Sequence, residues 1–311
     1  MSVLWKQSAV DVVGLLRSGE ISPVEAVQAA IARIETVDGK TNALPIRCFD
    51  RAIERAQTLD LTSHRQNPKS LCGLPIAVKD YNDVAGVRTT YGSPIFKDHI
   101  PEHSDVTVAV LEHNGANPIA KSNVPEWAGG HTFNPVNGLT CNPWNLSRSA
   151  GGSSGGSAAA LASGQVWLAT GNDLGGSLRT PAAFNAVVGL RPSPGVVPRG
   201  HGNLTFDTLW VEGPMGRSVG DVARHSYWNR KSLILISRVT ASGARVRHED
   251  IRDVSIGIRA LVASREDPTD LSREYQLDLH EQGQSQLLHV FGGKLTTFLS
   301  LSRKAANLLR L

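Results

Sequence analysis

Apolar residues recur at helical spacing in the first part of the chain. They do so through residues 8–18, and Gly19 follows as a stop signal. Ser22-Pro23-Val24-Glu25 is a capping box with proline at the first helical position, so a second helix is expected to begin there. A third helix is predicted over residues 50–59. These helices are expected to pack against a core, and we assign no chemistry to them.

From Leu74 onward, short apolar stretches alternate with turns rich in glycine, proline and asparagine. Helices alternating with short, fully apolar strands are typical of an α/β layered domain. The predicted elements are a strand over residues 74–80, a helix over 106–114, a strand over 117–120 and a buried strand over 166–170.

Composition narrows the class of protein. Of the 311 residues, 41% are hydrophobic and 19% are charged, which is typical of a globular chain. No run of about 18 apolar residues exists, which argues against a membrane span. The N-terminus lacks the apolar core of a secretory signal. The net charge of +4 is too small and too scattered to indicate nucleic-acid binding.

The cysteines and histidines suggest neither a disulfide framework nor a metal site. Cys48, Cys72 and Cys141 are far apart, and none of the 10 histidines falls in metal-ligand spacing. We therefore expect no metal, and we expect a reducing, cytoplasmic location.

The composition changes near residue 226. Residues 226–311 hold 13 Lys and Arg but 9 Asp and Glu, whereas residues 1–225 hold 19 of each. Of the 30 glycines, 25 lie in the first part, as do 15 of the 16 prolines. This shift favours two pieces of different origin, residues 1–225 and 226–311, although a glycine-rich core joined to a helical tail would give a similar pattern.

Two Gly/Ser-rich loops are the densest chemical feature. They cover residues 151–157 and 171–181, with a small-residue helix and a buried strand between them. Such loops let the backbone approach a ligand closely and point several N–H groups at one place. No lysine follows either loop, which argues against a phosphate-binding loop. A Gly-x-Ser-x-Gly elbow is present at residues 151–155, but a polar segment precedes it where a hydrophobic strand is needed. A turn without any role is the remaining alternative.

Residues 151–182 resemble the defining motif of the amidase signature family. The match includes the first serine pair, the Asp173-Leu-Gly-Gly-Ser177-Leu-Arg-Thr-Pro181 ending and the separation of 24 residues between Ser153 and Ser177. Further blocks resemble the family in its order, so the similarity covers essentially residues 1–225. These blocks are residues 73–80, 122–127, 133–134, 141–144, 189–193 and 213–218.

The resemblance implies an α/β fold, with a mixed sheet flanked by helices. It also implies a catalytic triad in which Ser177 is the nucleophile, Ser153 is a bridging serine after a cis peptide bond, and Lys79 is the base. Burial at the end of an apolar strand would lower the pKa of Lys79 and so suit it to take a proton. No metal or organic cofactor is implied.

The family places its oxyanion hole in the backbone before the nucleophile. In this chain the corresponding N–H groups are those of Leu174, Gly175, Gly176 and Ser177. Asp173 and Arg179 match positions that hold the loop, and Ser154 is expected to be a hydrogen-bond partner within the site. Asn172 stands where Ser or Thr is commoner in the family, and we expect it to tune the site.

The tail resembles a different family. Residues 248–311 are similar to flavin-dependent glycerol-3-phosphate dehydrogenases, through Gly257-Ile-Arg-Ala-Leu261 and Val290-Phe-Gly-Gly-Lys-Leu-Thr-Thr-Phe298. The Gly-x-Gly-x-x-Gly turn that flavin needs is absent, so no flavin binding is expected. We interpret the chain as a truncated amidase domain joined to a short α+β fragment. The apolar runs 233–236 and 287–291 are expected to pair onto the exposed edge of the sheet.

The sequence therefore predicts an amidase that cleaves a small-molecule amide, and esters of similar shape, through an acyl-enzyme. Two alternatives stay open: a catalytically impaired remnant, and a glutaminase of the amidotransferase type that is close to this family. No nucleic-acid or membrane partner is expected, and a homo-oligomer is possible.

Overall fold

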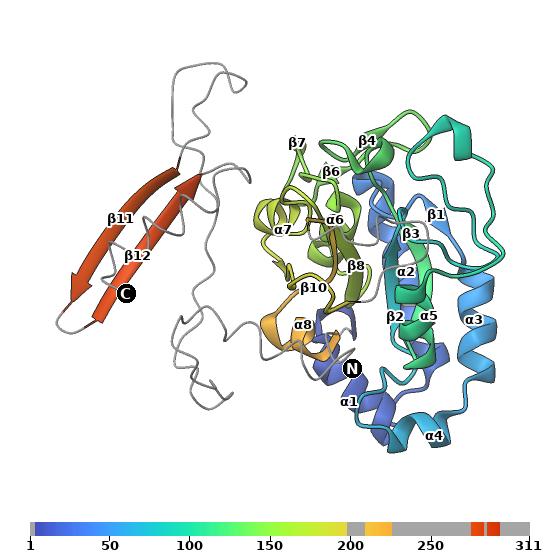
Figure 1. The fold of residues 1–311 in the computed structure, drawn as a ribbon. Helices are drawn as coiled ribbons and strands as arrows, with labels where there is room; N and C mark the ends of the chain where they lie inside the picture. The colour runs from blue at the N-terminus through green and yellow to red at the C-terminus, as the bar shows by residue number, and fades with distance from the viewer. Residues whose placement is uncertain (1–3, 198–208, 226–274, 283–284, 293–311) are drawn as a thin grey trace. The chain divides into compact units, whose positions relative to one another are not determined.

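A computed structural model describes residues 4–197, 209–225, 275–282 and 285–292 (Figure 1). The chain divides into two compact units, residues 1–236 and 237–311, which are described separately. The domain boundary that the composition indicates, after residue 225, stays a prediction.

The first unit holds the helices and most of the strands. Its helices are α1 (Ala9–Ser18), α2 (Pro23–Thr41), α3 (Phe49–Thr58), α4 (Leu61–Gln66), α5 (Val106–His113), α6 (Gly155–Ala162), α7 (Arg179–Asn185) and α8 (Val219–His225), with short 3-10 turns η1 (Leu4–Lys6), η2 (Pro94–Phe96) and η3 (Glu126–Ala128). Its strands are β1 (Ile46–Arg47), β2 (Pro75–Lys79), β3 (Asn117–Ser122), β4 (Phe133–Asn134), β5 (Gly138–Leu139), β6 (Cys141–Asn142), β7 (Asn145–Ser149), β8 (Leu168–Asp173), β9 (Val188–Gly189) and β10 (Val211–Gly216).

Local signals set where the first helices begin and end. Ser8 caps α1 by accepting a hydrogen bond from the Asp11 N–H, and Gly19 ends it in the left-handed conformation. At α2 the Ser22 side chain accepts from the Glu25 N–H while Glu25 accepts from the Ser22 N–H, so the predicted capping box is present. The helix predicted over residues 50–59 is α3.

Six strands form one mixed sheet in the order β1-β3-β2-β8-β10-β9. The neighbours β3, β2 and β8 run parallel, whereas β1, β10 and β9 pair antiparallel to their neighbours. The α/β mixed sheet flanked by helices that the sequence predicts is therefore confirmed. The buried strand predicted over residues 166–170 is β8, which begins two residues later and continues to Asp173.

The central strands are covered on both faces. Every residue of β2, β3, β8 and β10 is buried, so burial does not alternate between the two faces of these strands. Helix α6 packs on these four strands and α2 packs on β2. Because α6 is built from glycine, serine, alanine and one leucine, its backbone can come close to the sheet.

The ends of three central strands lie next to one another on one side of the sheet, which we call the shared strand edge. The parallel strands β2 and β8 end there at Lys79 and Asp173, and the antiparallel β10 begins there, with Val211 opposite Asp173. Residues at these three strand ends are thus brought together although 132 positions separate Lys79 from Val211 in the numbering.

The two ends of the first unit are joined by polar contacts. Arg217, directly after β10, donates to the backbone carbonyls of Trp5 and Gln7. Asp221 in α8 accepts from the Val10 N–H at 3.2 Å. Helices α1 and α8 are accordingly in contact.

The described part of the second unit is an antiparallel pair, β11 (Tyr275–Gln282) and β12 (Ser285–Gly292). Residues 287–291 lie in β12 and pair with β11 in a two-stranded sheet. The pairing of this run onto the edge of the six-stranded sheet stays a prediction. Residues 233–236, and most of the segment that resembles the dehydrogenases, lie outside the described residues.

Within the described ranges, no helix combines the length and the apolar character needed to cross a membrane.

Candidate active site

Lys79 is the centre of a buried polar cluster at the shared strand edge. Its side chain is fully buried, and its backbone N–H donates to Thr170 Oγ1 at 2.8 Å. Its Nζ lies 2.7 Å from Ser153 Oγ, 2.9 Å from Ser154 Oγ and 2.5 Å from Asn172 Oδ1. No carboxylate of the described residues lies within 4.0 Å of Nζ. Lys79 is therefore a buried amine surrounded by neutral oxygens.

Burial lowers the pKa of Lys79 to about 7, and the negative charges of Glu212 and Asp173 oppose this shift. At neutral pH a substantial fraction of the amine is therefore uncharged. A neutral amine has two N–H donors and one lone pair, and only that lone pair can take a proton.

The partners of Nζ determine where the lone pair points. Asn172 Oδ1 can only accept a hydrogen bond. Ser154 Oγ lies 3.4 Å from the backbone carbonyl oxygen of Asn172, which can only accept a hydrogen bond. Ser154 therefore donates its single proton to that carbonyl and accepts a hydrogen bond from Nζ. Both N–H groups are then used, and the lone pair faces Ser153 Oγ.

Ser153 sits in the first Gly/Ser loop, before α6. The Gly152–Ser153 peptide bond is cis, as the resemblance to the family implies. The loop packs so tightly that a Cβ on Gly152 would overlap Gly130 O, and this position therefore admits only glycine. Thr132 fastens the same loop through hydrogen bonds from its N–H and hydroxyl to the Gly151 carbonyl.

Ser177 is half-buried in the second Gly/Ser loop, between β8 and α7. Its carbonyl accepts a hydrogen bond from the Ser154 N–H at 3.3 Å, which places its backbone next to the Ser153–Ser154 pair. Its hydroxyl makes no hydrogen bond to Ser153 or Lys79 within the described residues. The structure thus brings Lys79 and Ser153 into contact and places Ser177 beside them through its backbone.

Asp173 holds the loop that carries Ser177. Its buried carboxylate accepts from the Gly176 N–H at 2.8 Å and the Leu178 N–H at 3.1 Å. It also pairs with Arg179 and Arg191, each at 3.0 Å. Burial by itself would raise the pKa of Asp173, but the Arg179 hydrogen bond and charge, with the two N–H groups, outweigh it and lower the pKa. Asp173 and Arg179 have the structural role that the sequence predicts.

The same contacts correct one of the predicted oxyanion donors. The Gly176 N–H points to Asp173 Oδ1, so it is already satisfied and does not face a substrate. For the described residues, no hydrogen bond occupies the N–H groups of Leu174, Gly175 and Ser177. Leu174 and Gly175 are exposed. The binding of an oxyanion by these three N–H groups stays a prediction.

Sequence reasoning missed Glu212, which is a buried carboxylate of the site. It lies opposite Asn172 in the β8–β10 register, and it accepts from Trp210 Nε1 at 3.1 Å and Asn82 Nδ2 at 3.4 Å. Burial raises the pKa of Glu212, while the Trp210 hydrogen bond and the charge of Lys79 lower it in part. The sequence signal that could have indicated it is a charged residue within the otherwise uncharged segment that forms β10.

A second buried lysine was also missed. Lys121 is the penultimate residue of β3, opposite Val78 of β2, and its Nζ lies 3.2 Å from Asp80 Oδ1. It donates to the Asn82 carbonyl and Thr89 Oγ1, both at 2.7 Å. Lys121 thus has a buried carboxylate partner, whereas the Nζ of Lys79 has, among the described residues, only neutral oxygens beside it.

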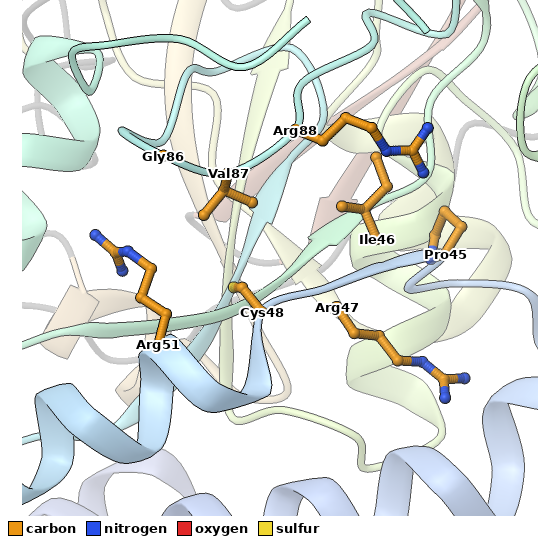
Figure 2. Close-up of a pocket in the computed structure, with 8 residues that line it drawn as sticks. All are labelled: Pro45, Ile46, Arg47, Cys48, Arg51, Gly86, Val87 and Arg88. Atoms are coloured by element: carbon orange, nitrogen blue, oxygen red, sulfur yellow. The ribbon is translucent and has the colours of Figure 1, made fainter. Parts of the chain in front are cut away.

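A separate hollow of about 400 Å³ lies away from these groups (Figure 2). Arg51 is paired with Glu112 at 2.6 Å, and Arg88 donates to the Lys97 carbonyl at 2.9 Å. Figure 2 shows the guanidinium group of Arg51 on the opposite side from those of Arg47 and Arg88, so the three do not converge on one anion site. The hollow is lined by Pro45, Ile46, Arg47, Cys48, Arg51, Gly86, Val87 and Arg88.

Comparison with known proteins decides the family. The family model described as Amidase matches residues 25–229, which include both Gly/Ser loops and Lys79. The chain belongs to the amidase signature family. The chain is 45% identical over 206 residues to the glutamyl-tRNA(Gln) amidotransferase A subunit of Anaeromyxobacter dehalogenans (strain 2CP-C), covering 65% of this chain and 42% of that protein.

Solved amidase signature structures share its fold. A bacterial aryl acylamidase of the family superposes with a TM-score of 0.67 at 33% identity, covering 73% of this chain and 49% of that one. The 6-aminohexanoate cyclic dimer hydrolase in complex with substrate superposes with a TM-score of 0.66 at 33% identity, covering 73% and 46%. The chain thus spans less than half the length of these relatives.

Proposed function

We propose that the protein is a hydrolase of carboxylic amides, and of esters of similar shape, that uses Ser177 as nucleophile, Ser153 as bridging serine and Lys79 as base. One observation carries the proposal: a fully buried amine without a carboxylate partner within the described residues, 2.7 Å from the hydroxyl of Ser153. No metal or organic cofactor takes part in the proposed reaction.

The proposed acylation begins with attack of Ser177 Oγ on the amide carbon. The Ser177 proton passes to Ser153 Oγ while Ser153 gives its own proton to Lys79 Nζ. The oxygen that becomes negative is stabilised by the N–H groups of Leu174, Gly175 and Ser177, and each such donor is typically worth about 10²–10³ in rate.

The tetrahedral intermediate then collapses. The C–N bond breaks, the Lys79 ammonium returns its proton through Ser153 to the leaving amine, and the acyl group stays on Ser177. Water repeats the sequence on the acyl-enzyme and releases the carboxylic acid. An ester follows the same route with an alcohol as the leaving group.

Labelling with a fluorophosphonate tests the nucleophile without a known substrate. We expect intact mass to show one adduct on the wild-type chain and none on Ser177→Ala. Lys79→Met should slow labelling by about 10²–10⁴, because the general base is removed. Ser147→Ala, an exposed serine in β7, is the matched control and should label like the wild type. Absence of an adduct on a folded wild-type chain would overturn the proposal and favour the impaired remnant.

A glutaminase is the second candidate. The identity of 45% to a glutamyl-tRNA(Gln) amidotransferase chain favours it. Ammonia release from glutamine, measured with and without the other amidotransferase chains, separates the two activities. Release that requires those chains would assign the glutaminase, whereas hydrolysis of other amides by this chain alone would assign the general amidase.

Three further proposals concern the chain as a whole. The unpaired state of Cys48, Cys72 and Cys141 supports a cytoplasmic location. Exposed apolar side chains such as Phe133, Trp144 and Phe184 support self-association. The interpretation of residues 226–311 as a fragment of different origin fused to a truncated amidase rests on the sequence pattern alone.

A further inference from the structure

Six ring side chains form one continuous aromatic group beside the candidate active site. Trp210 and Tyr81 have ring centroids 4.9 Å apart, Tyr81 and Tyr91 are 5.7 Å apart edge-to-face, and Tyr91 stacks on Trp127 at 5.7 Å with an angle of 3° between the planes. Phe96 packs edge-to-face on Tyr91 at 5.2 Å and on Trp127 at 5.4 Å. We call this group the aromatic platform: Tyr81, Tyr91, Phe96, His99, Trp127 and Trp210.

One end of the platform lies over the end of β8. Tyr81 follows Lys79 by two residues, and Trp210 directly precedes β10, whose Val211 is opposite Asp173. Because β8 lies between β2 and β10, the two rings must reach toward each other across the end of β8 to come within 4.9 Å. The loop that carries Ser177 leaves β8 at this point.

The other end of the platform reaches the loop that carries Ser153. Trp127 lies in η3, and the residues that follow it pack on that loop, where Gly130 O fills the space beside Gly152. Trp127 is 48% exposed although one of its faces stacks on Tyr91. The platform therefore runs from the strand edge to the cis-serine loop and leaves the indole partly open.

Polar contacts fix the rings in place. The Tyr91 hydroxyl donates to Asp83 Oδ1 at 2.7 Å, and Trp210 Nε1 donates to Glu212. The Trp127 N–H donates to the Tyr91 carbonyl at 2.9 Å, with both residues at positive φ, 49° and 50°. Burial raises the pKa of Tyr91, so its hydroxyl stays protonated and keeps this contact. A ligand ring would meet a preformed surface.

We propose that the aromatic platform binds an aromatic or flat heteroaromatic group of the amide substrate, with Trp127 as the stacking residue. This inference rests on the proposed function and names its substrate class. Asp83 and the exposed Glu126 stand beside the rings, so neutral rings are favoured over rings that carry a carboxylate. Ring stacking of this kind changes rates or affinities by about 2- to 10-fold.

Two fluorophosphonates of equal intrinsic reactivity test the preference, one bearing a phenyl group and one a short alkyl group. We expect the wild type to react faster with the phenyl probe. Trp127→Leu should lower the phenyl-to-alkyl rate ratio by about 2- to 10-fold, and Trp127→Phe should retain most of it. Trp144→Ala, an exposed tryptophan outside the platform, should keep the wild-type ratio. An unchanged ratio in Trp127→Leu would overturn the inference.

A binding measurement separates this inference from the proposed function. Acetanilide is titrated into the full-length Ser177→Ala chain while tryptophan fluorescence is recorded. We expect a saturable change that is lost in the Ser177→Ala/Trp127→Leu double variant. Saturable binding supports the platform even if neither probe labels the wild type, and absence of saturable binding overturns the platform even if the alkyl probe labels Ser177.

Discussion

Lys79 Nζ and Ser153 Oγ lie 2.7 Å apart inside the protein, and the other two partners of Nζ are acceptors that direct its lone pair at this hydroxyl. In the neutral amine this lone pair therefore lies beside the Ser153 hydroxyl before any substrate binds.

The first prediction concerns pH. Burial lowers the pKa of Lys79 to about 7, and only the neutral amine can accept the proton of Ser153. The rate of fluorophosphonate labelling at Ser177 should therefore rise about tenfold per pH unit below pH 7 and level off above it. A labelling rate measured from pH 5 to 9 that does not change across this range would exclude Lys79 as the base.

Replacing Glu212 by glutamine should move this profile to lower pH. The negative charge of Glu212 raises the pKa of Lys79, so its removal lowers that pKa and frees the neutral amine at more acidic pH. The midpoint of the labelling profile measures the shift. Glu126→Gln removes an exposed carboxylate and should leave the midpoint in place. A shift of the Glu212→Gln midpoint toward alkaline pH would contradict the electrostatic role.

Replacing Gly152 by alanine should disrupt the cis-serine loop. The added Cβ would overlap Gly130 O, so we expect a loss of about 1–3 kcal/mol in the free energy of unfolding, together with loss of labelling. Urea unfolding measures the first effect and intact mass the second. Gly14→Ala in α1 is the matched control, because its Cβ meets no atom within 4 Å. It should stabilise the helix by about 0.5–1 kcal/mol.

Replacing Asp173 by asparagine should release the nucleophile loop. The change removes the charge that Arg179 and Arg191 share and one of the acceptors of the loop N–H groups. Breaking a buried pair on one side typically costs about 3–5 kcal/mol. Asp98→Asn, whose partner Lys97 is 3.9 Å away and also exposed, should cost less than about 1 kcal/mol. Equal urea midpoints for the two variants would rule out the structural role of Asp173.

The acid stability of this loop has a defined sign. The folded-state pKa of Asp173 lies below its usual value, so the stability from its contacts is fully present above about pH 4. That stability is lost as pH falls through the lowered folded-state pKa. In Asp173→Asn this part of the acid unfolding transition should be missing, which urea unfolding at several pH values below 5 would reveal.

The sequence was sufficient to place candidate site residues whose position depends on the local segment around them. Lys79 ends a short apolar strand, Ser153 follows two glycines, and Asp173 begins a motif that holds the second loop, so each could be placed from its neighbours in the chain. The resemblance to a family added the roles that local pattern does not carry. The capping box at Ser22 and Glu25 was likewise readable, because both partners lie within one helical turn.

The sequence was insufficient where function depends on strand register. Glu212 meets the site only because β10 pairs antiparallel with β8 and places it opposite Asn172. The aromatic platform joins Tyr81 to Trp210 across the same sheet. The Gly176 N–H was misassigned because the backbone conformation that turns it toward Asp173 is set by the folded loop and is not visible in the motif.

The contacts between Arg217 and the carbonyls of Trp5 and Gln7 have a practical consequence for work with this protein. They fasten the exit of β10, the strand that carries Glu212, to the first residues of the described chain. Trimming the N-terminus to residue 8, or clipping it with a protease, would remove both carbonyls and loosen that strand. Damage of this kind would reach the environment of Lys79 from a distance, so an inactive preparation should be checked for an intact N-terminus before its catalytic residues are suspected.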